Sequence, residues 1–286
     1  MAAGHRKVQE VVPAAGRTVH SLRDIGYELP QAVADLVDNS IEAGATEIRI
    51  DLQFSGEKSW IRIADNGDGM DTETITESLR IGSIRDYSED DLGKFGFGLK
   101  TASISQCRRV VVASRIAPQR ARLEARVFDL NHIETTNRWE VIILDPHERP
   151  EHLTEPLQDT TGTVVLWEDL DRVLTYKDPD GYWAKRKLLA EAENVAEHLG
   201  MVFHRFLSGK ARRRQKIDIF VNDSIVEPWD PFCTDEPETE TIAPEYYQVK
   251  SDTQQGIVTL RPFVLPGQSE FSDSVAWNRA SGPKKW

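Results

Sequence analysis

The alternation of hydrophobic and polar positions predicts a helix near the start of the chain, followed by two strands. Between residues 28 and 43 the apolar residues recur at helical spacing on one arc, which holds Leu29, Val33, Leu36, Val37 and Ile41. The opposite arc holds Asp35, Asp38, Asn39 and Glu42. Gly44 ends the helix, and residues 48–52 alternate as in a half-buried strand, which a turn at 55–58 connects to a second strand at 60–64.

The pattern of the following residues predicts an α+β fold. Residues 72–92 are polar and acidic with only a short helical pattern, which is typical of a long excursion from the core. A helix begins after Gly98, strands are predicted at 109–114, 122–130, 140–144 and 163–167, and a long helix at about 183–207. This order predicts a two-layer sandwich, in which a mixed, mostly antiparallel sheet is covered by helices on one face.

The chain length leaves room for two domains of unequal size. A chain of 286 residues, of which 39% are hydrophobic, is long enough for one large core or two modest ones. We expect an N-terminal tail at 1–20, a first domain at 21–213 and a smaller second domain at 214–286. Strands predicted at 217–221 and 256–264 belong to the second domain, and the acidic stretch around Pro237–Glu240 is an exposed linker.

The net charge limits the partners that the chain can bind. A formal charge of −12 argues against a broad nucleic-acid surface, because such binding depends on many lysine and arginine side chains. The basic run at 210–216 is either a solvated loop or a local patch for nucleic acid. No apolar run in the sequence approaches the roughly 20 residues that span a bilayer, so we expect a protein without membrane contact.

The two cysteines, Cys107 and Cys233, are far apart and lack the neighbours of a zinc motif. Neither a disulfide scaffold nor a zinc site is therefore predicted. A reducing, cytoplasmic compartment fits this composition best.

A carboxylate is predicted at the end of the second strand. Asp65 shares strand parity with Ile61 and Ile63, so its side chain follows a row that points into the core. A buried charge needs a partner, and an exocyclic amine would donate to it, while Gly67 and Gly69 let the backbone pass close to a flat ring. Alone, the sequence Asp65–Gly69 (DNGDG) is more typical of a surface turn.

A glycine-rich segment precedes the next helix, whose first turns carry Lys100, Thr101 and Ser103; its glycines are Gly93, Gly96 and Gly98. Backbone N–H groups at such a helix N-terminus favour a phosphate. The segment misses the Walker A pattern because Leu99 separates the last glycine from the lysine, and it does not follow a strand of a βαβ unit. P-loop and Rossmann interpretations are therefore disfavoured, and the segment by itself is weak evidence for a nucleotide.

Asp35 and Asn39 lie one turn apart on the polar face of the first helix. A carboxylate can take the proton from an attacking water, and an amide oxygen can occupy one site of a Mg²⁺ ion that otherwise keeps waters and phosphate oxygens. The pair therefore suits metal-assisted hydrolysis. A merely solvated helix face is the alternative explanation.

These signals occur together and in order, and they resemble the ATP site of the GHKL superfamily, which includes the gyrase B subunit, MutL, heat-shock chaperones, sensor histidine kinases and MORC proteins. Asp35–Ser40 (DLVDNS) resembles the N box of the family, and residues 37–46 look especially like gyrase and MutL. Residues 93–103 (GKFGFGLKTAS) look more like MORC-type lids, and Thr161–Val165 (TGTVV) matches the late Gly-Thr that closes the adenine pocket. The resemblance covers roughly residues 21–170, and bacterial MORC-like ATPases are the nearest match.

The resemblance implies a Bergerat-type fold and a role for each matching residue. Asp35 would be the general base, Asn39 would hold Mg²⁺, and Asp65 would accept a hydrogen bond from the amino group of adenine. The residues that line the base would be Gly67, Gly69, Met70 and Thr163. The phosphates would be capped by a lid at about 72–98 and the start of the next helix, including Lys94, Gly96, Phe97, Gly98, Leu99 and Lys100. The resemblance also implies ATP-dependent homodimerisation and a transducer-like second domain.

The chain departs from the family in two respects. The general base of the family is usually Glu, and Asp35 is shorter by about 1.5 Å, one carbon–carbon bond, so hydrolysis is expected to be slow. Relatives with a complete transducer domain supply a lysine from it to the terminal phosphate. We expect either that Lys284 or Lys285 serves here or that the native protein is longer, with an incomplete second domain in this sequence.

The leading interpretation is a Mg²⁺-dependent ATPase whose lid closure on ATP promotes dimerisation and serves a larger assembly, with a MORC-like, DNA-related or defence role. The alternative is an ATP-gated dimerisation switch that does not hydrolyse. A sensor histidine kinase is disfavoured, because it needs a phospho-accepting histidine on a helical hairpin, and His20 lacks that context. Additional domains or protein partners would specify the biological process.

Overall fold

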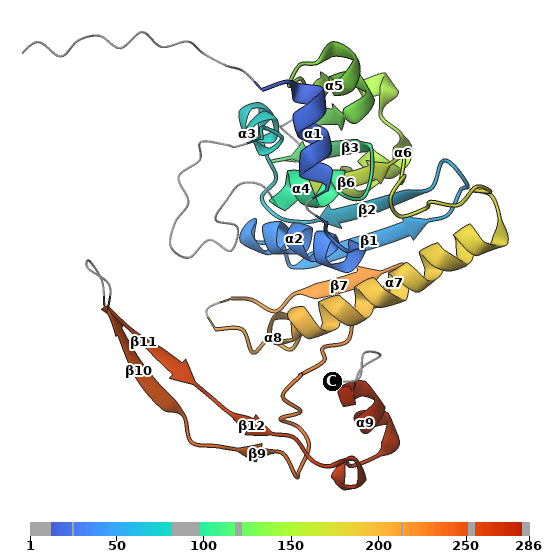
Figure 1. Cartoon of the computed structure of the whole chain (residues 1–286). Helices are drawn as coiled ribbons and strands as arrows, with labels where there is room; N and C mark the ends of the chain where they lie inside the picture. Colours follow the sequence, from blue (N-terminus) through green and yellow to red (C-terminus); the bar gives the residue numbers. More distant parts are fainter. Residues whose placement is uncertain are drawn as a thin grey trace, which may run out of the picture.

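The main body of the molecule is built on an eight-stranded sheet (Figure 1). The computed structural model describes residues 13–24, 26–81, 98–117, 122–212, 214–250 and 255–281. The strands lie in the order β5 (Ile142–Ile143), β4 (Glu124–Asp129), β3 (Arg109–Arg115), β6 (Gly162–Glu168), β2 (Trp60–Asp65), β1 (Glu47–Gln53), β7 (Asp218–Val221) and β8 (Ser224–Ile225). Neighbouring strands are antiparallel, except that β1 and β7 are parallel. The predicted mixed, mostly antiparallel sheet is therefore confirmed.

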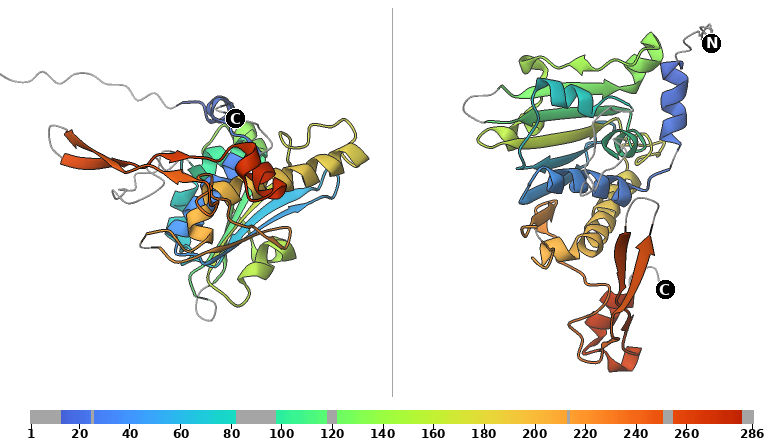
Figure 2. Two further views of the ribbon diagram at one scale, coloured as in Figure 1. Left: turned by 90° about the horizontal axis from the view of Figure 1, so that it is seen from below. Right: turned by 90° about the vertical axis from the view of Figure 1, so that its left-hand side faces the viewer.

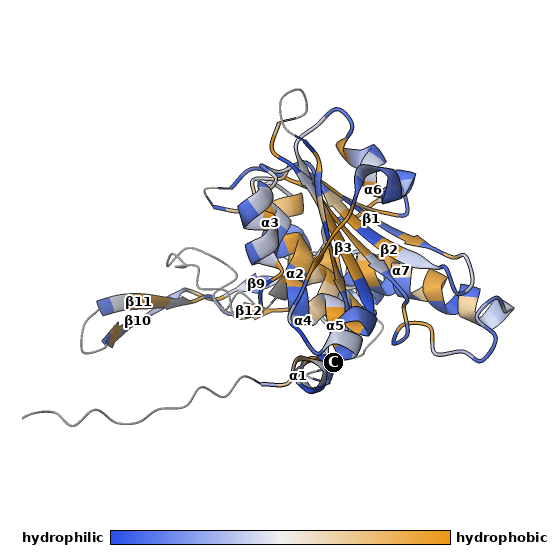
Figure 3. Ribbon diagram, turned by 90° about the horizontal axis from the view of Figure 1, so that it is seen from above, coloured by the Kyte–Doolittle hydropathy of each residue, from blue (hydrophilic) through white to orange (hydrophobic). Residues whose placement is uncertain are grey.

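A layer of helices packs on one face of this sheet. It contains α1 (Ala15–Arg23), α2 (Leu29–Glu42), α3 (Thr72–Ser78), α4 (Gly98–Ile104), α5 (Leu130–Thr136) and α7 (Tyr182–Val202). Apolar residues of these helices share one core with strand side chains of one parity, such as Ile61, Ile63 and Trp167. Figure 3 shows hydrophobic positions recurring along the strands and along the helices that cover them. The predicted α+β sandwich is present.

The opposite face of the sheet is also covered in part, which the sequence analysis did not predict. Leu144, Leu153 and Leu157 pack there against side chains of the other parity, among them Val111 and Leu166. This cover comes from the segment with η1 (Pro146–Glu148), α6 (Glu151–Thr154) and η2 (Glu155–Leu157). The strand predicted at 140–144 has only two residues, because the chain turns at Leu144 toward this second core.

The N-terminal tail predicted at 1–20 overlaps a helix. Helix α1 begins at Ala15, and both Ala15 and Val19 are buried in the main core. The helix packs against α5 and α4. Its short apolar pattern is weak in the sequence, so tertiary packing rather than intrinsic propensity stabilises it.

The domain boundary predicted at 213/214 falls inside the first domain. Strand β7 pairs with β1 and strand β8 pairs with β7, so both strands extend the main sheet. Ile219 and Val221 of β7 are buried in the main core. The described residues of the basic run at 210–216 lie in the loop before β7. The helix predicted at 183–207 ends at Val202, and α8 (His204–Leu207) follows after Phe203.

A two-stranded ribbon extends from the main body (Figure 2). Its strands are β9 (Glu240–Thr241) with β12 (Phe263–Val264), and β10 (Glu245–Lys250) with β11 (Gln255–Leu260). At its base the ring of Phe263 lies 4.9 Å from that of Phe232. The chain continues into η3 (Gln268–Glu270) and α9 (Ser274–Ser281). Over the described ranges, no helix has the length and apolar character needed to cross a membrane.

Candidate functional site

Asp65, at the end of β2, accepts three hydrogen bonds from three parts of the chain. Its Oδ1 accepts from the backbone N–H of Gly67 at 2.9 Å and from that of Thr163 at 3.2 Å. Its Oδ2 accepts from the hydroxyl of Ser40 on α2 at 3.0 Å. Burial raises the pKa of Asp65, and these hydrogen bonds oppose the rise. The carboxylate therefore joins α2, the loop after β2 and the start of β6.

The loop that follows Asp65 is fixed against the end of α2 and the start of β1. Oδ1 of Asn66 accepts from the backbone N–H of Thr46 at 2.9 Å and of Glu47 at 3.0 Å. The backbone N–H of Asp68 donates to the carbonyl of Ala43 at 2.9 Å. The DNGDG sequence is therefore an anchored part of the fold and not a free surface turn.

Two glycines allow backbone segments to meet beside Asp65. Gly69 has a φ of +73°, and a Cβ there would lie 2.2 Å from the carbonyl oxygen of Arg115. Gly162 has a φ of +136°, and a Cβ there would lie 1.9 Å from the carbonyl oxygen of Asp65. On the side where a Cβ of Gly69 would stand, the backbone of Arg115 approaches closely, so the missing side chain is needed by the fold itself.

Ser114, at the end of β3, connects the segments that surround Thr163. Its hydroxyl accepts from the backbone N–H of Met70 at 2.7 Å and donates to the carbonyl of Gly162 at 2.9 Å. The hydroxyl of Thr163 lies 2.9 Å from it. Sequence analysis missed Ser114. The available signal was a polar residue directly after the apolar run Val110–Ala113.

Helix α2 places Asp35 and Asn39 half-buried on its polar side. A capping box of Glu28 and Gln31 begins the helix, and its predicted apolar arc is buried. Burial raises the pKa of Asp35. Ser40, next to Asn39, connects this helix to Asp65.

The structure describes the glycine-rich segment only from Gly98 onward. Three of the predicted phosphate-capping residues, Lys94, Gly96 and Phe97, lie outside the described residues. Gly98 begins α4, and Leu99 packs against the main core. Lys100 is 4% exposed, and its Nζ donates to the carbonyl of Arg80, which follows α3. Burial lowers the pKa of Lys100 to about 8. In this conformation Lys100 connects α3 to α4.

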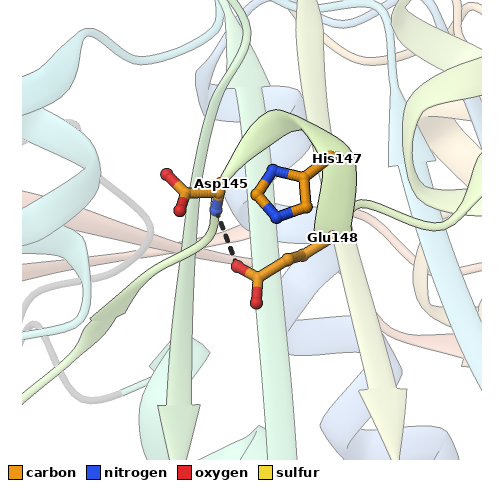
Figure 4. Close-up of side chains that lie close together, drawn as sticks. All are labelled: Asp145, His147 and Glu148. Atoms are coloured by element: carbon orange, nitrogen blue, oxygen red, sulfur yellow. Dashed lines mark hydrogen bonds between the residues drawn. The ribbon is translucent and has the colours of Figure 1, made fainter.

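A separate group of possible metal ligands lies at η1, on the surface (Figure 4). Ligand atoms of Asp145, His147 and Glu148 lie within 4.8 Å of one another, and all three residues are exposed. The carboxylate of Glu148 accepts from the backbone N–H of Asp145 at 3.1 Å, as in a capping box. Local helix capping accounts for this cluster, so we assign no metal to it.

The donor set around α2 and β2 fits an adenine nucleotide and Mg²⁺. A carboxylate has about four lone-pair positions, and Asp65 uses three of them, so Oδ2 retains one for an exocyclic amine. On α2, which packs against α4, Asp35 and Asn39 supply a carboxylate and an amide oxygen, both suited to water and to Mg²⁺. The predicted residues of the base pocket, Gly67, Gly69, Met70 and Thr163, are gathered around Asp65 and Ser114.

This fold and this site define a Bergerat-type ATP-binding domain of the GHKL superfamily. Residues 27–163 match the family described as histidine kinase-, DNA gyrase B-, and HSP90-like ATPase. That part of the chain belongs to the superfamily, as its motifs indicate.

Several relatives of the chain carry the name DNA mismatch repair protein MutL. The chain is 38% identical over 184 residues to MutL of Actinobacillus succinogenes, which covers 63% of the chain and 25% of the relative. It is 44% identical over 115 residues to MutL of Aliivibrio salmonicida, with 38% and 18% covered. It is 41% identical over 98 residues to MutL of Thermosipho africanus, with 32% and 17% covered. The matches thus span a quarter or less of these relatives' length. The MORC-like similarity of the lid stays a prediction.

Proposed function

We propose that the chain binds ATP with Mg²⁺ and hydrolyses it slowly, and that ATP-driven lid closure and dimerisation serve a larger assembly. The observation that carries this proposal is the placement of Asp65, which Thr163 of β6 and Ser40 of α2 hold at the end of β2. The family of residues 27–163 supports ATP binding by this part of the chain.

In this proposal the amino group of adenine donates to Oδ2 of Asp65, and Gly67, Gly69, Met70 and Thr163 line the base. The phosphates contact Lys100 and the segment before it, including Lys94, Gly96, Phe97, Gly98 and Leu99. With a pKa of about 8, Lys100 is mostly protonated at neutral pH, which a phosphate contact requires.

Asn39 holds Mg²⁺ through its amide oxygen, and the ion, when bound, offsets negative charge on the phosphate oxygens. Asp35, one helical turn earlier, takes the proton from the attacking water. Burial raises the pKa of Asp35, which makes the ionised carboxylate a stronger base. Its short side chain places the oxygen farther from the water than a Glu would, so turnover is slow.

Substitution of the proposed base tests the reaction. Asp35→Ala should abolish steady-state phosphate release while ATP binding, measured by calorimetry, persists. The matched control is Glu47→Gln on β1, because the carboxylate of Glu47 is half-exposed and pairs with Arg49, and this variant should hydrolyse ATP like the wild type. Turnover that survives in Asp35→Ala would contradict the role of the base.

The second candidate is an ATP-gated dimerisation switch without useful hydrolysis. The aspartate in place of a longer glutamate at position 35 favours this candidate. Sedimentation velocity with ATP and with a non-hydrolysable analogue separates the two functions. A dimer that lasts equally long with both nucleotides supports the switch, whereas a dimer that decays only with ATP supports the ATPase.

We extend the proposal to the biological role and the location of the protein. Relatives named DNA mismatch repair protein MutL support a DNA-related role, and the lid sequence supports a MORC-like or defence role. The net charge of −12 restricts any contact with nucleic acid to a local patch. Cys107 and Cys233 are free thiols, which supports a reducing, cytoplasmic location. Additional domains or protein partners complete the assembly.

A further inference from the structure

The hydroxyl group of Ser114 lies at the meeting point of three backbone segments. Ser114 is 0% exposed, so water does not compete for its hydrogen bonds. Three groups lie at hydrogen-bond distance: the N–H of Met70 at 2.7 Å, the carbonyl of Gly162 at 2.9 Å and the hydroxyl of Thr163 at 2.9 Å. These contacts exhaust what one hydroxyl can make, since it has one proton and two lone pairs.

The chemistry of the neighbours fixes the direction of each bond. The carbonyl of Gly162 only accepts, so Ser114 gives its single proton to that oxygen. The backbone N–H of Met70 only donates and takes one lone pair of Ser114. The remaining lone pair faces Thr163, whose hydroxyl therefore donates to Ser114.

Because the hydroxyl of Thr163 donates its proton to Ser114, it can only accept a hydrogen bond from a ligand. The adjacent Asp65 carboxylate likewise only accepts. We infer that Ser114 is a specificity-determining residue, which acts through Thr163 to make this end of the pocket favour a purine with a 6-amino group over one with a 6-carbonyl. The inference rests on the proposed binding of ATP at this site.

Comparison of ATP with inosine triphosphate tests this role, because the two nucleotides differ in the 6-amino and 6-carbonyl groups. Calorimetry with Mg²⁺ gives both dissociation constants for the wild type and for Ser114→Ala. The preference for ATP, given by the ratio of the two dissociation constants, should fall about tenfold in the variant. A tenfold change corresponds to the free energy of about one hydrogen bond. The reason is that the freed hydroxyl of Thr163 can turn and donate to the 6-carbonyl.

The ratio of the two affinities separates this role from a purely structural one. Both nucleotides are measured on the same sample, so a loss of folded protein lowers both affinities and leaves their ratio unchanged. If Ser114→Ala does not fold, Ser114→Cys serves instead, because a thiol is a weaker donor and acceptor. The preference of Ser114→Cys for ATP should lie between that of the wild type and that of a protein in which the hydroxyl of Thr163 is free to turn.

Ser59→Ala is the matched control. The hydroxyl of Ser59 is also buried, accepts from the backbone N–H of Ser55 at 2.9 Å and donates to the carbonyl of Gly56 at 2.6 Å, but at the opposite end of β2. This variant should keep the preference of the wild type. Thr163→Val removes the oriented hydroxyl itself, so adding it to Ser114→Ala should lower the preference no further than the larger single effect.

The outcomes distinguish this inference from the proposed function. A wild type that binds ATP, with an unchanged ATP preference in Ser114→Ala or Ser114→Cys, overturns the role of Ser114 and leaves ATP binding intact. A wild type that binds neither nucleotide overturns the proposed function itself.

Discussion

Asp38 is a carboxylic acid on α2 that the fold keeps half-buried beside Asp35 and Glu42. Burial, together with these two carboxylates, raises its pKa from the ordinary 3.8 to about 6. Below pH 3.8 the group is protonated in both the folded and the unfolded chain. As the pH rises through about 6, the folded chain must carry an unfavourable charge, so stability is lost.

Asp38→Asn should therefore stabilise the protein at pH 7.5. The expected gain in the free energy of unfolding is about 1–2 kcal/mol, after allowance for solvent screening of a partly exposed group. The gain should shrink toward zero as the pH falls to 3.8. Urea denaturation of both proteins across this range measures it, and a gain that does not change with pH would show that the charge of Asp38 is not its cause.

At the scale of residues, the sequence predicted polar side chains better than it predicted their partners. Asp65 follows a strand of known parity, so its place at the edge of the core could be predicted. Its contacts with Ser40 and Thr163 could not, because these residues are 25 and 98 positions away and reach Asp65 through the packing of α2 and the pairing of β2 with β6. The same holds for Ser114, whose partners lie 44 to 49 positions away.

Helix α4 is held at its C-terminal end by an arginine from α1. Arg23 is 3% exposed, and its guanidinium donates to the carbonyl of Ile104 at 2.7 Å and to that of Cys107 at 3.5 Å. It also pairs with Asp171 at 2.5 Å. The helix that would face the phosphates is thus anchored at its other end to α1 and to the loop after β6.

Arg23→Met should lower the free energy of unfolding by about 3 kcal/mol, because it leaves the two carbonyls without this donor and removes the shorter of the two ion pairs of Asp171, the other being with Arg108 at 3.9 Å. Arg172→Met is the matched control: Arg172 donates to the carbonyl of Arg23 and to Asp24 from the surface, so its loss should cost less than about 1 kcal/mol. Urea denaturation compares the two variants. Equal losses would contradict the special role of the buried arginine.

At the scale of elements, strongly periodic segments could be predicted and weakly periodic ones could not. The helix at α2 and the strands β1, β2, β3 and β6 were predicted within one or two residues. Helix α1 was missed because Ala15 and Val19 are buried only by packing against other helices. Strand β7 was assigned to the wrong domain, since its alternating pattern does not reveal that its partner is β1, about 170 residues earlier.

At the scale of the molecule, Val226 is the last described residue along the chain that belongs to either hydrophobic core of the sheet. Beyond it, the segment that leads to the ribbon contacts the main body, for example through Phe232 with His204 and through the N–H of Trp229, which donates to the carbonyl of Gly200. On the ribbon, directly opposite residues share a face, so Tyr247, Val249, Val258 and Leu260 lie together and exposed. An isolated two-stranded ribbon is marginally stable in water.

A chain truncated after Glu236 should therefore fold and keep the thermal stability of the main body. A chain truncated after Gly209 is the matched control and should fail to fold, because it lacks β7 and the buried side chains of Ile217, Ile219 and Val221. Thermal denaturation followed by circular dichroism compares the two. Unfolding of the longer chain would show that the ribbon supports the core.

The central position of β6 sets the order in which the protein can mature during synthesis. β6 lies between β2 and β3, although both of those strands precede it in the chain by 40 residues or more. Until Glu168 has been made, a nascent chain has two separate halves of a sheet, each with open edges prone to pairing with other chains. The lateness of this one strand makes the growing polypeptide depend on protection from aggregation until Glu168 has been translated.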